Sequence, residues 1–238
     1  MNWTLSRGNP PTYDEFHALE ASCFSHSMYT PVQFNDLDKD YLWSVRLGER
    51  LIGFMYVGVL EGRIHIRAIA VAEEYRRRGI AQQLFAQAFE LAGQLGVLKV
   101  TLAVLSQNLP AMSLYIKLGF GAVGQSSRFS VPLATLPDAG EIAVEREGEG
   151  YAFWARLLKN GVLIGRGHMN TEIGGCKDLE LDNPAANLPG ALSALKGLLK
   201  PESSQLYVMT SRADVIQACR ACSLPLDCEI IEMERIVA

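Results

Sequence analysis

The sequence predicts an α/β (α+β) fold in which a mixed central sheet is flanked by helices, arranged as two tandem copies with the second truncated. Three observations predict it. Apolar residues make up 49% of the 238 residues, enough for a packed core. Segments with strand periodicity and amphipathic helical segments alternate after a hairpin, as is typical of such sheets. The same order of segments then recurs in the second half of the chain.

The first copy opens with a short strand over residues 3–6 and a helix over residues 12–24. Thr12 is a suitable N-cap for this helix, because its hydroxyl can accept a hydrogen bond from an amide of the first turn. Pro31 is well placed to begin a second, short helix that runs toward Leu37.

A hairpin and a third strand follow. Residues 41–47 and 50–60 are apolar or alternating segments on either side of a Gly-Glu turn. Residues 63–72 form the next strand, and its alternation predicts two faces. We expect one face to hold Ile64, Ile66, Ala68 and Ala70, and the other to hold His65, Arg67, Ile69 and Val71.

The clearest helix lies between Gly79 and Gly96. Its apolar residues recur at helical spacing, and Gly96 is a typical C-terminal residue. The predicted stripe consists of Ile80, Leu84, Ala88, Leu91, Ala92 and Leu95. A buried strand over 97–105, a helix over 110–118 and one or two strands within 120–133 complete the copy, which we assign to residues 1–130.

Residues 131–150 are predicted to be a linker that can include a short strand over residues 142–144, and residues 151–238 a second domain. Leu51-Ile52-Gly53 recurs there as Leu163-Ile164-Gly165. The second copy is expected to lack the first strand and the opening helices. Its predicted elements are strands over 151–159 and 162–169, a strand over 178–181, a helix over 188–199, a strand over 206–210, a helix over 213–221 and a strand over 229–237.

Charge and composition exclude several classes of protein. Residues 1–130 carry 12 Lys/Arg against 11 Asp/Glu (+1) and residues 131–238 carry 10 against 15 (−5), which argues against nucleic-acid binding. The longest uncharged apolar stretch, Leu51–Leu60, is too short to span a membrane, for which about 20 residues are needed. No apolar signal segment stands at the N-terminus. We therefore expect a cytoplasmic protein without nucleic-acid or membrane partners.

The cysteines predict neither disulfides nor a metal site. The five are Cys23, Cys176, Cys219, Cys222 and Cys228, an odd and scattered set that favours free thiols. Cys219 and Cys222 form a single pair inside a predicted helix, with no second pair or histidines nearby to complete a zinc site. Asp36, Asp38 and Asp40 have the spacing of a calcium loop, but Tyr41 stands where that loop requires glycine.

One segment carries the chemistry. A strand that ends near Val71 is followed by Arg76, Arg77 and Arg78, and Gly79 then opens the clearest helix. The first turn of a helix has unpaired amides and the positive end of the dipole, so it favours anions such as phosphate. Gly79 allows close approach of a ligand to the backbone. The alternative from the residues alone is a solvated turn of arginines, and a Walker-type loop is absent.

The segment resembles the acetyl-CoA signature of the GNAT N-acetyltransferase superfamily. Arg76-x-x-Gly79-x-Ala81 is similar to its diphosphate loop, and Ile69-Ala70-Val71 to the preceding strand. A second similarity runs from Asn108 through Tyr115 to Leu118-Gly119-Phe120. The resemblance covers about residues 1–130, with its specific motifs within 69–120.

This resemblance implies acetyl-CoA (coenzyme A) as cofactor and an amine acceptor. The strand at Ile69 and the strand at Val100 should separate, so that backbone groups of Ile69, Ala70 and Val71 pair with pantetheine. The diphosphate should lie on Arg76, Arg77, Arg78, Gly79, Ile80 and Ala81. Asn108 should hold the helix entry or the pantetheine. Tyr115 should protonate the leaving thiolate, a role that suits a phenol.

The acceptor side is less determined. The family often has a glutamate where this chain has residues 101–104, Thr-Leu-Ala-Val, so no general base is assigned. His65, expected on the same strand face as Ile69, is a candidate, although a hydrogen-bonded structural role is the alternative. His26 and Tyr29 are candidate acceptor contacts. The acceptor, a small-molecule or peptide amine, and the choice between monomer and homodimer stay open.

The second copy is expected to have lost the cofactor site. Its counterpart of the loop, residues 182–190, has no Arg or Lys, and Asp182 would repel phosphate. Aligning Asn108 with Arg212 places Cys219 where Tyr115 stands. The sequence thus predicts an N-acetyltransferase with a catalytic first domain, and the alternative is a non-catalytic acyl-CoA-binding regulatory or scaffold module.

Overall fold

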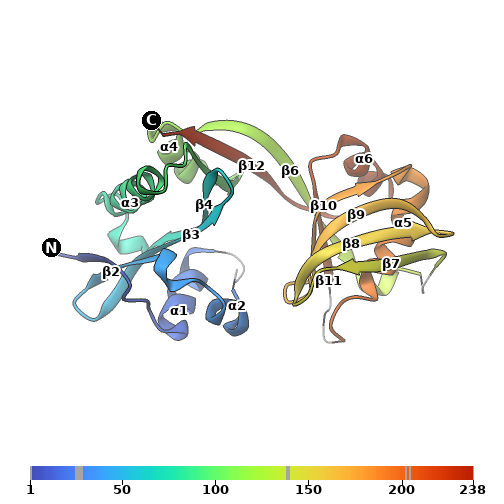
Figure 1. Ribbon diagram of the computed structural model, residues 1–238, viewed down its shortest axis with the longest axis horizontal. Helices are drawn as coiled ribbons and strands as arrows, with labels where there is room; N and C mark the ends of the chain where they lie inside the picture. The colour runs from blue at the N-terminus through green and yellow to red at the C-terminus, as the bar shows by residue number, and fades with distance from the viewer. Residues whose placement is uncertain (1, 25–28, 138–139, 202, 204, 238) are drawn as a thin grey trace. The chain divides into compact units, whose positions relative to one another are not determined.

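A computed structural model describes residues 2–24, 29–137, 140–201, 203 and 205–237 (Figure 1). The chain divides into two compact units. The first comprises Met1–Val104, Leu109–Val123 and Glu232–Ala238, and the second comprises Leu105–Asn108 and Gly124–Ile231. No helix among the described residues is long and apolar enough to cross a bilayer.

The predicted elements of the first unit are present with small shifts of their ends. In chain order they are β1 (Thr4–Arg7), α1 (Tyr13–Cys23), α2 (Pro31–Asn35), β2 (Leu42–Leu47), β3 (Arg50–Leu60), β4 (Arg63–Val71), α3 (Ile80–Leu95), β5 (Lys99–Leu105) and α4 (Leu109–Lys117). Thr12 caps α1 through a capping box with Glu15, and Gly96 ends α3 with a left-handed φ of 65°. Leu95, expected in the apolar stripe of α3, is 43% exposed.

The sheet of the first unit has the strand order β1-β2-β3-β4-β5-β12. Strands β1 to β4 pair antiparallel in sequence, and β4 pairs parallel with β5. Phe16 and Leu19 of α1 pack with Phe54 of β3 on one face. Ile80 of α3 lies against Gly53, the neighbour of Phe54, and therefore covers the opposite face. The sheet at β3 is thus covered by α1 on one face and by α3 on the other.

A β-bulge in β4 corrects the predicted faces of this strand. Tyr56 pairs with Ala68 and the next residue, Val57, pairs with Ile66, so Arg67 is an extra residue. An extra residue reverses the alternation beyond it. Ala68 and Ala70 consequently join the core beside α1, whereas Ile64 and Ile66 lie on the face of Val57. The prediction of one shared face for these four residues was wrong.

The second unit repeats the strand pattern of the first. Its elements are β6 (Gly121–Pro132), β7 (Ile142–Glu147), β8 (Ala152–Lys159), β9 (Val162–Asn170), β10 (Gly175–Leu181), α5 (Pro184–Lys196), β11 (Gln205–Thr210), α6 (Ala213–Ala221) and β12 (Leu226–Ile236). The order is β6-β11-β10-β9-β8-β7, with antiparallel pairs except for the parallel pair β10–β11. Gly53 on β3 is paired with β2 and β4, and Gly165 on β9 is paired with β8 and β10. The two glycines therefore hold matching places.

Two expectations for the second unit need correction. Strand β7 takes the place of the first strand, which was expected to be missing, so the truncation removes only the two opening helices. Helix α5 begins at Pro184 rather than at 188 and contains Pro189. A proline in a helix lacks the amide and crowds the preceding turn, so its presence suggested a later start. Helices α5 and α6 share one apolar core, with side chains such as Leu188, Leu192 and Cys219.

The division into units does not follow the order of the chain. The last residues of the chain, Glu232–Ala238, belong to the first unit, where the amide of Val237 donates to the carbonyl of Leu98 (2.8 Å). Most of β6, which follows α4 in the chain, belongs instead to the second unit and pairs with β11. The sequence-based boundaries at residues 130 and 150 were drawn without this exchange of strands.

Candidate functional site

The candidate site begins at the end of β4, where backbone groups face away from β3. The amide of Ala72 donates to the carbonyl of Ile52 across the β3–β4 pair (2.9 Å). Backbone groups of successive strand residues point to alternate sides, so those of Ile69 and Val71 point to the other side of β4. On that side the carbonyl of Val71 accepts from Nε of Arg76 (3.0 Å) and from the thiol of Cys23 (3.5 Å).

The neighbouring strand does not cover this edge. Strands β4 and β5 pair only from Arg63–Lys99 to Ile66–Leu102, although β4 continues to Val71 and β5 to Leu105. Pairing ends where the bulge at Arg67 bends β4. From Arg67 onward, no described strand pairs with the β5 side of β4. The carbonyl of Val71 is occupied by Arg76 and Cys23, but the backbone groups of Ile69 and the amide of Val71 can accept an extended ligand as an additional strand.

The loop between β4 and α3 is shaped by two left-handed residues. A single 3-10 turn over Glu73–Tyr75 is followed by Arg76 in extended conformation. Arg77 (φ 60°) and Gly79 (φ 85°) are both left-handed. Such a conformation is costly for arginine, at roughly 1 kcal/mol, and almost free for glycine. The strained Arg77 lies at the candidate site, where such strain is often found.

The first turn of α3 presents unpaired amides. The first backbone bond at this end runs from Gln83 to the carbonyl of Gly79 (3.0 Å), and no side chain caps the helix. Within the described residues, the amides of Gly79, Ile80, Ala81 and Gln82 therefore have no acceptor. Four such amides at the positive end of a helix form a site for an anion.

The three arginines of the loop differ in what they contact. Arg76 is directed back onto the protein, where it bonds Val71 and lies 3.7 Å from the sulfur of Cys23. Arg78 donates to the carbonyl of Glu74 (3.0 Å) and packs on the ring of Tyr75. Arg77 is exposed. The side chain of Arg76 thus fixes the loop to the end of β4, which the sequence did not reveal.

Tyr115 is a buried phenol on α4. Its ring packs against Phe85 of α3 (centroids 5.5 Å apart) and against Phe120 (6.1 Å). Burial raises the pKa of Tyr115 to about 12. Its hydroxyl has no hydrogen-bond partner among the described residues. Asn108 immediately precedes α4, and its amide donates to the carbonyl of Leu105 (2.9 Å).

The acceptor candidates occupy the face of α1. His65 pairs with Gly58, so the bulge places it opposite to the face of Ile69, contrary to the sequence-based expectation. Nδ1 of His65 lies 2.9 Å from the hydroxyl of Thr101, which matches the structural alternative. Tyr29 packs edge-on against Phe16 and Tyr56. His26 lies outside the described residues.

The second unit offers no comparable anion site. Only Asp182 and Asn183 stand between β10 and α5, because the rest of the expected loop, residues 184–190, is helical. Among the described residues, no group of three His, Cys, Asp or Glu side chains could hold a metal ion. All five cysteines are free.

Comparisons with known proteins agree with this geometry. Residues 10–120 match the model of the acetyltransferase (GNAT) family. An uncharacterized N-acetyltransferase, YobR, of Bacillus subtilis is 35% identical over 77 residues. That match covers 32% of this chain and about a third (31%) of the length of that relative. Residues 10–120 are therefore similar to the acetyltransferase (GNAT) family.

Solved structures resemble the whole chain in fold. A putative acetyltransferase from Pyrococcus horikoshii has a TM-score of 0.74 at 14% identity, and the match covers 99% of this chain and 90% of that one. A tandem GNAT protein from the clavulanic acid biosynthesis pathway has a TM-score of 0.70 at 13% identity, with 100% and 99% covered. The mixed α/β fold and its tandem arrangement are thus those of known GNAT structures.

Proposed function

We propose that the first unit transfers an acetyl group from acetyl-CoA to an amine acceptor by direct attack of the amine on the thioester. One observation carries the proposal. The edge of β4 that β5 leaves uncovered, with the backbone groups of Ile69 and the amide of Val71, is followed within the same unit by the unpaired amides of Gly79 to Gln82. These residues fit an extended pantetheine on the strand and a diphosphate on the helix.

The backbone also supplies stabilisation for the reaction. When bound, acetyl-CoA supplies the activated thioester carbonyl. Negative charge develops on the carbonyl oxygen as the amine attacks, and fixed amide donors stabilise such charge strongly. The amide of Ile69 faces the side from which β5 has separated, so it is the donor that we assign to this role.

Tyr115 is assigned the role of proton donor to the leaving sulfur. With its pKa raised to about 12, the phenol stays protonated throughout the neutral range. A thiol has a pKa of about 8.5, so Tyr115 is the weaker acid and transfers its proton only as charge builds on the sulfur. No general base is assigned, because His65 is engaged with Thr101. The amine loses its proton to water as the C–N bond forms and the C–S bond breaks, and water returns a proton to the tyrosinate that is left on Tyr115.

A single substitution tests the proposal against the alternative of a non-catalytic acyl-CoA-binding module. CoA release is measured with a panel of small amines and peptides, for the wild type, for Tyr115→Phe and for Tyr207→Phe as a control in the second unit. We expect Tyr115→Phe to lower turnover about 100-fold, the lower range for loss of an acid catalyst, while CoA affinity is kept. Binding of CoA without turnover on any amine favours the non-catalytic module.

A further inference from the structure

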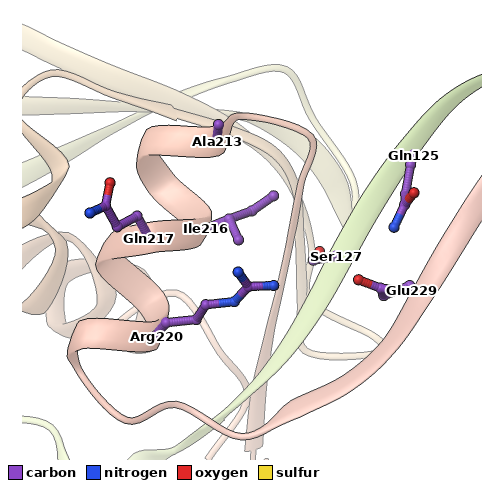
Figure 2. A pocket seen from close by; sticks show the side chains of 7 residues that line it. All are labelled: Gln125, Ser127, Ala213, Ile216, Gln217, Arg220 and Glu229. Atoms are coloured by element: carbon purple, nitrogen blue, oxygen red, sulfur yellow. The ribbon is translucent and has the colours of Figure 1, made fainter.

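The second unit contains a cavity that has no counterpart in the proposed reaction. It has a volume of about 590 Å³ and lies between α6 and the strands β6 and β12, all within Gly124–Ile231 (Figure 2). This volume falls in the range of about 300–1,000 Å³ that is typical of small-molecule sites. The lining residues are Gln125, Ser127, Ala213, Ile216, Gln217, Arg220 and Glu229.

The cavity is separate from the place that corresponds to Tyr115. Helix α6 lines it with Ala213, Ile216, Gln217 and Arg220, which form one stripe at helical spacing. The buried residues of α6, among them Cys219, lie on the opposite face and pack into the core. Cys219 aligns with Tyr115, so the cavity is no remnant of a cofactor channel on that side.

Polar groups of opposite charge converge on the cavity. The guanidinium of Arg220 and the carboxylate of Glu229 extend into it from α6 and β12, and the amide of Gln125 does so from β6 (Figure 2). Within the described part of the chain, neither Arg220 nor Glu229 has an ion pair. An arginine and a carboxylate that face one cavity without pairing can each bind the opposite charge of a ligand.

Ser127 provides an independent observation. Its side chain belongs to the cavity wall, although the residue is only 3% exposed. Its hydroxyl makes no hydrogen bond to any residue that the structure describes. As part of the cavity wall, this hydroxyl can bond a polar ligand that enters the cavity. Ile216 and Ala213 add an apolar wall beside these polar groups.

We infer that this cavity binds a small zwitterion of the amino-acid class. Arg220 pairs with the carboxylate, Glu229 pairs with the ammonium group, and Gln125 and Ser127 offer further hydrogen bonds. A ligand that carries both charges can pair with both side chains at once, whereas a ligand with a single charge leaves one of them unpaired. This site is distinct from the acetyl-transfer site proposed for the first unit, and neither proposal depends on the other.

Calorimetric titration of the full chain tests the inference. The probes are L-alanine and L-alanyl-L-alanine, and acetate and ethylamine serve as half-ligands with one charge each. We expect saturable binding of at least one zwitterion, with each half-ligand at least 10-fold weaker. Arg220→Gln and Glu229→Gln should each weaken binding about 10-fold or more, and Arg220→Lys should retain part of it. Arg166→Gln on β9, outside the cavity, should bind as the wild type does.

Several outcomes would overturn the inference. The first is that neither zwitterion binds saturably. The second is that acetate or ethylamine binds as tightly as the zwitterions do. Unchanged affinity in Arg220→Gln and Glu229→Gln would place any binding elsewhere. Both residues lie at the surface of the unit, so the variants should fold, and far-UV circular dichroism of each variant verifies this.

Discussion

The two units share a strand order, yet their central helices begin differently. In the first, the amides of Gly79 to Gln82 are unpaired. In the second, α5 begins with Pro184, which has no amide hydrogen, and the amides of Ala186 and Asn187 both donate to the carbonyl of Asn183. Asp182 stands beside this turn with a negative charge. The same helix position can therefore bind an anion in one unit and repel it in the other.

The parallel strand pairs differ in a similar way. In both units the fourth strand carries a bulge and the parallel ladder is short. Thr210 follows the last residue of β11 that pairs with β10. Its hydroxyl donates to the carbonyl of Leu179 (3.0 Å). By register, Thr210 corresponds to Val104 and Leu179 to Ile69. A side chain thus occupies in the second unit the backbone edge that is free in the first.

The comparison teaches that this fold can lose a cofactor site without losing its topology. A proline, an aspartate and a threonine are enough to occupy this site or to repel an anion from it. The reason is that the site consists of backbone groups that must stay unpaired. Such groups carry no side-chain signature of their own. Each difference can be exchanged between the units by a single substitution.

The largest effect is expected from a charge at the start of α3. Ala81→Asp places a carboxylate beside the proposed diphosphate and competes for the same amides, so we expect the Kd for CoA to rise about 100-fold, equivalent to about 2.7 kcal/mol. Ala185→Asp occupies the same position of α5 and should leave the affinity unchanged. Calorimetry on both variants makes the comparison. Equal affinities in the two would mean that CoA does not use this turn.

A smaller effect should follow from closing the edge of β4. Val104→Thr imports the hydroxyl of Thr210 into the first unit, where it can bond the backbone near Ile69. We expect CoA to bind about 10-fold more weakly, the effect of one lost or blocked hydrogen bond. The reverse change, Thr210→Ala, should cost about 1 kcal/mol of unfolding free energy and leave CoA affinity as it is. Tighter binding in Val104→Thr would contradict the assignment of this edge.

Low pH should lower the stability of the first unit through a contact of α1, a helix that the second unit lacks. Hydrogen bonds from Arg46 (2.7 and 3.0 Å), followed by that from the Thr12 amide, lower the pKa of Glu15 from 4.5 to about 2. The lowered pKa contributes stability above pH 4.5 that is lost as the pH falls toward 2. At pH 7, Glu15→Gln should lose about 1 kcal/mol of unfolding free energy in urea, and the difference should vanish near pH 2. Glu147→Gln, on exposed β7, serves as the control.

The smallest effect concerns alkaline pH. Burial raises the pKa of Tyr115 to about 12, so the folded protein favours the protonated phenol. The resulting stability is complete below pH 10 and is lost as the pH rises toward 12. Wild type should therefore lose more unfolding free energy than Tyr115→Phe between pH 9 and 11. Parallel curves for the two proteins would indicate that the phenol is more accessible to water than its position on α4 implies.

Local signals in the sequence predicted most of the elements. Thr12, Gly79 and Gly96 mark helix ends by their own chemistry, and the structure has helix ends at these positions. The loop at Arg76–Ala81 and Tyr115 followed from motifs, and their proposed roles stay predictions. The bulge at Arg67 did not follow, because register depends on the partner strand.

Contacts between segments far apart in sequence could not be predicted either. Nothing in residues 226–237 indicates that their last part joins the first unit, since that choice rests on packing between segments far apart in sequence. The bond from Arg76 to Val71 and the contact with Cys23 need the folded loop. Thr210 became informative only when the strand registers placed it opposite Leu179.

The exchange of edge strands has a consequence for biosynthesis. The first unit requires Glu232–Ala238, so it cannot be completed on the ribosome while the remainder of the chain is still being made. Until then β5 lacks the neighbour that it has in the finished sheet, and an open strand edge is prone to mispairing. The first sheet would thus be completed only after translation has passed through the whole second unit.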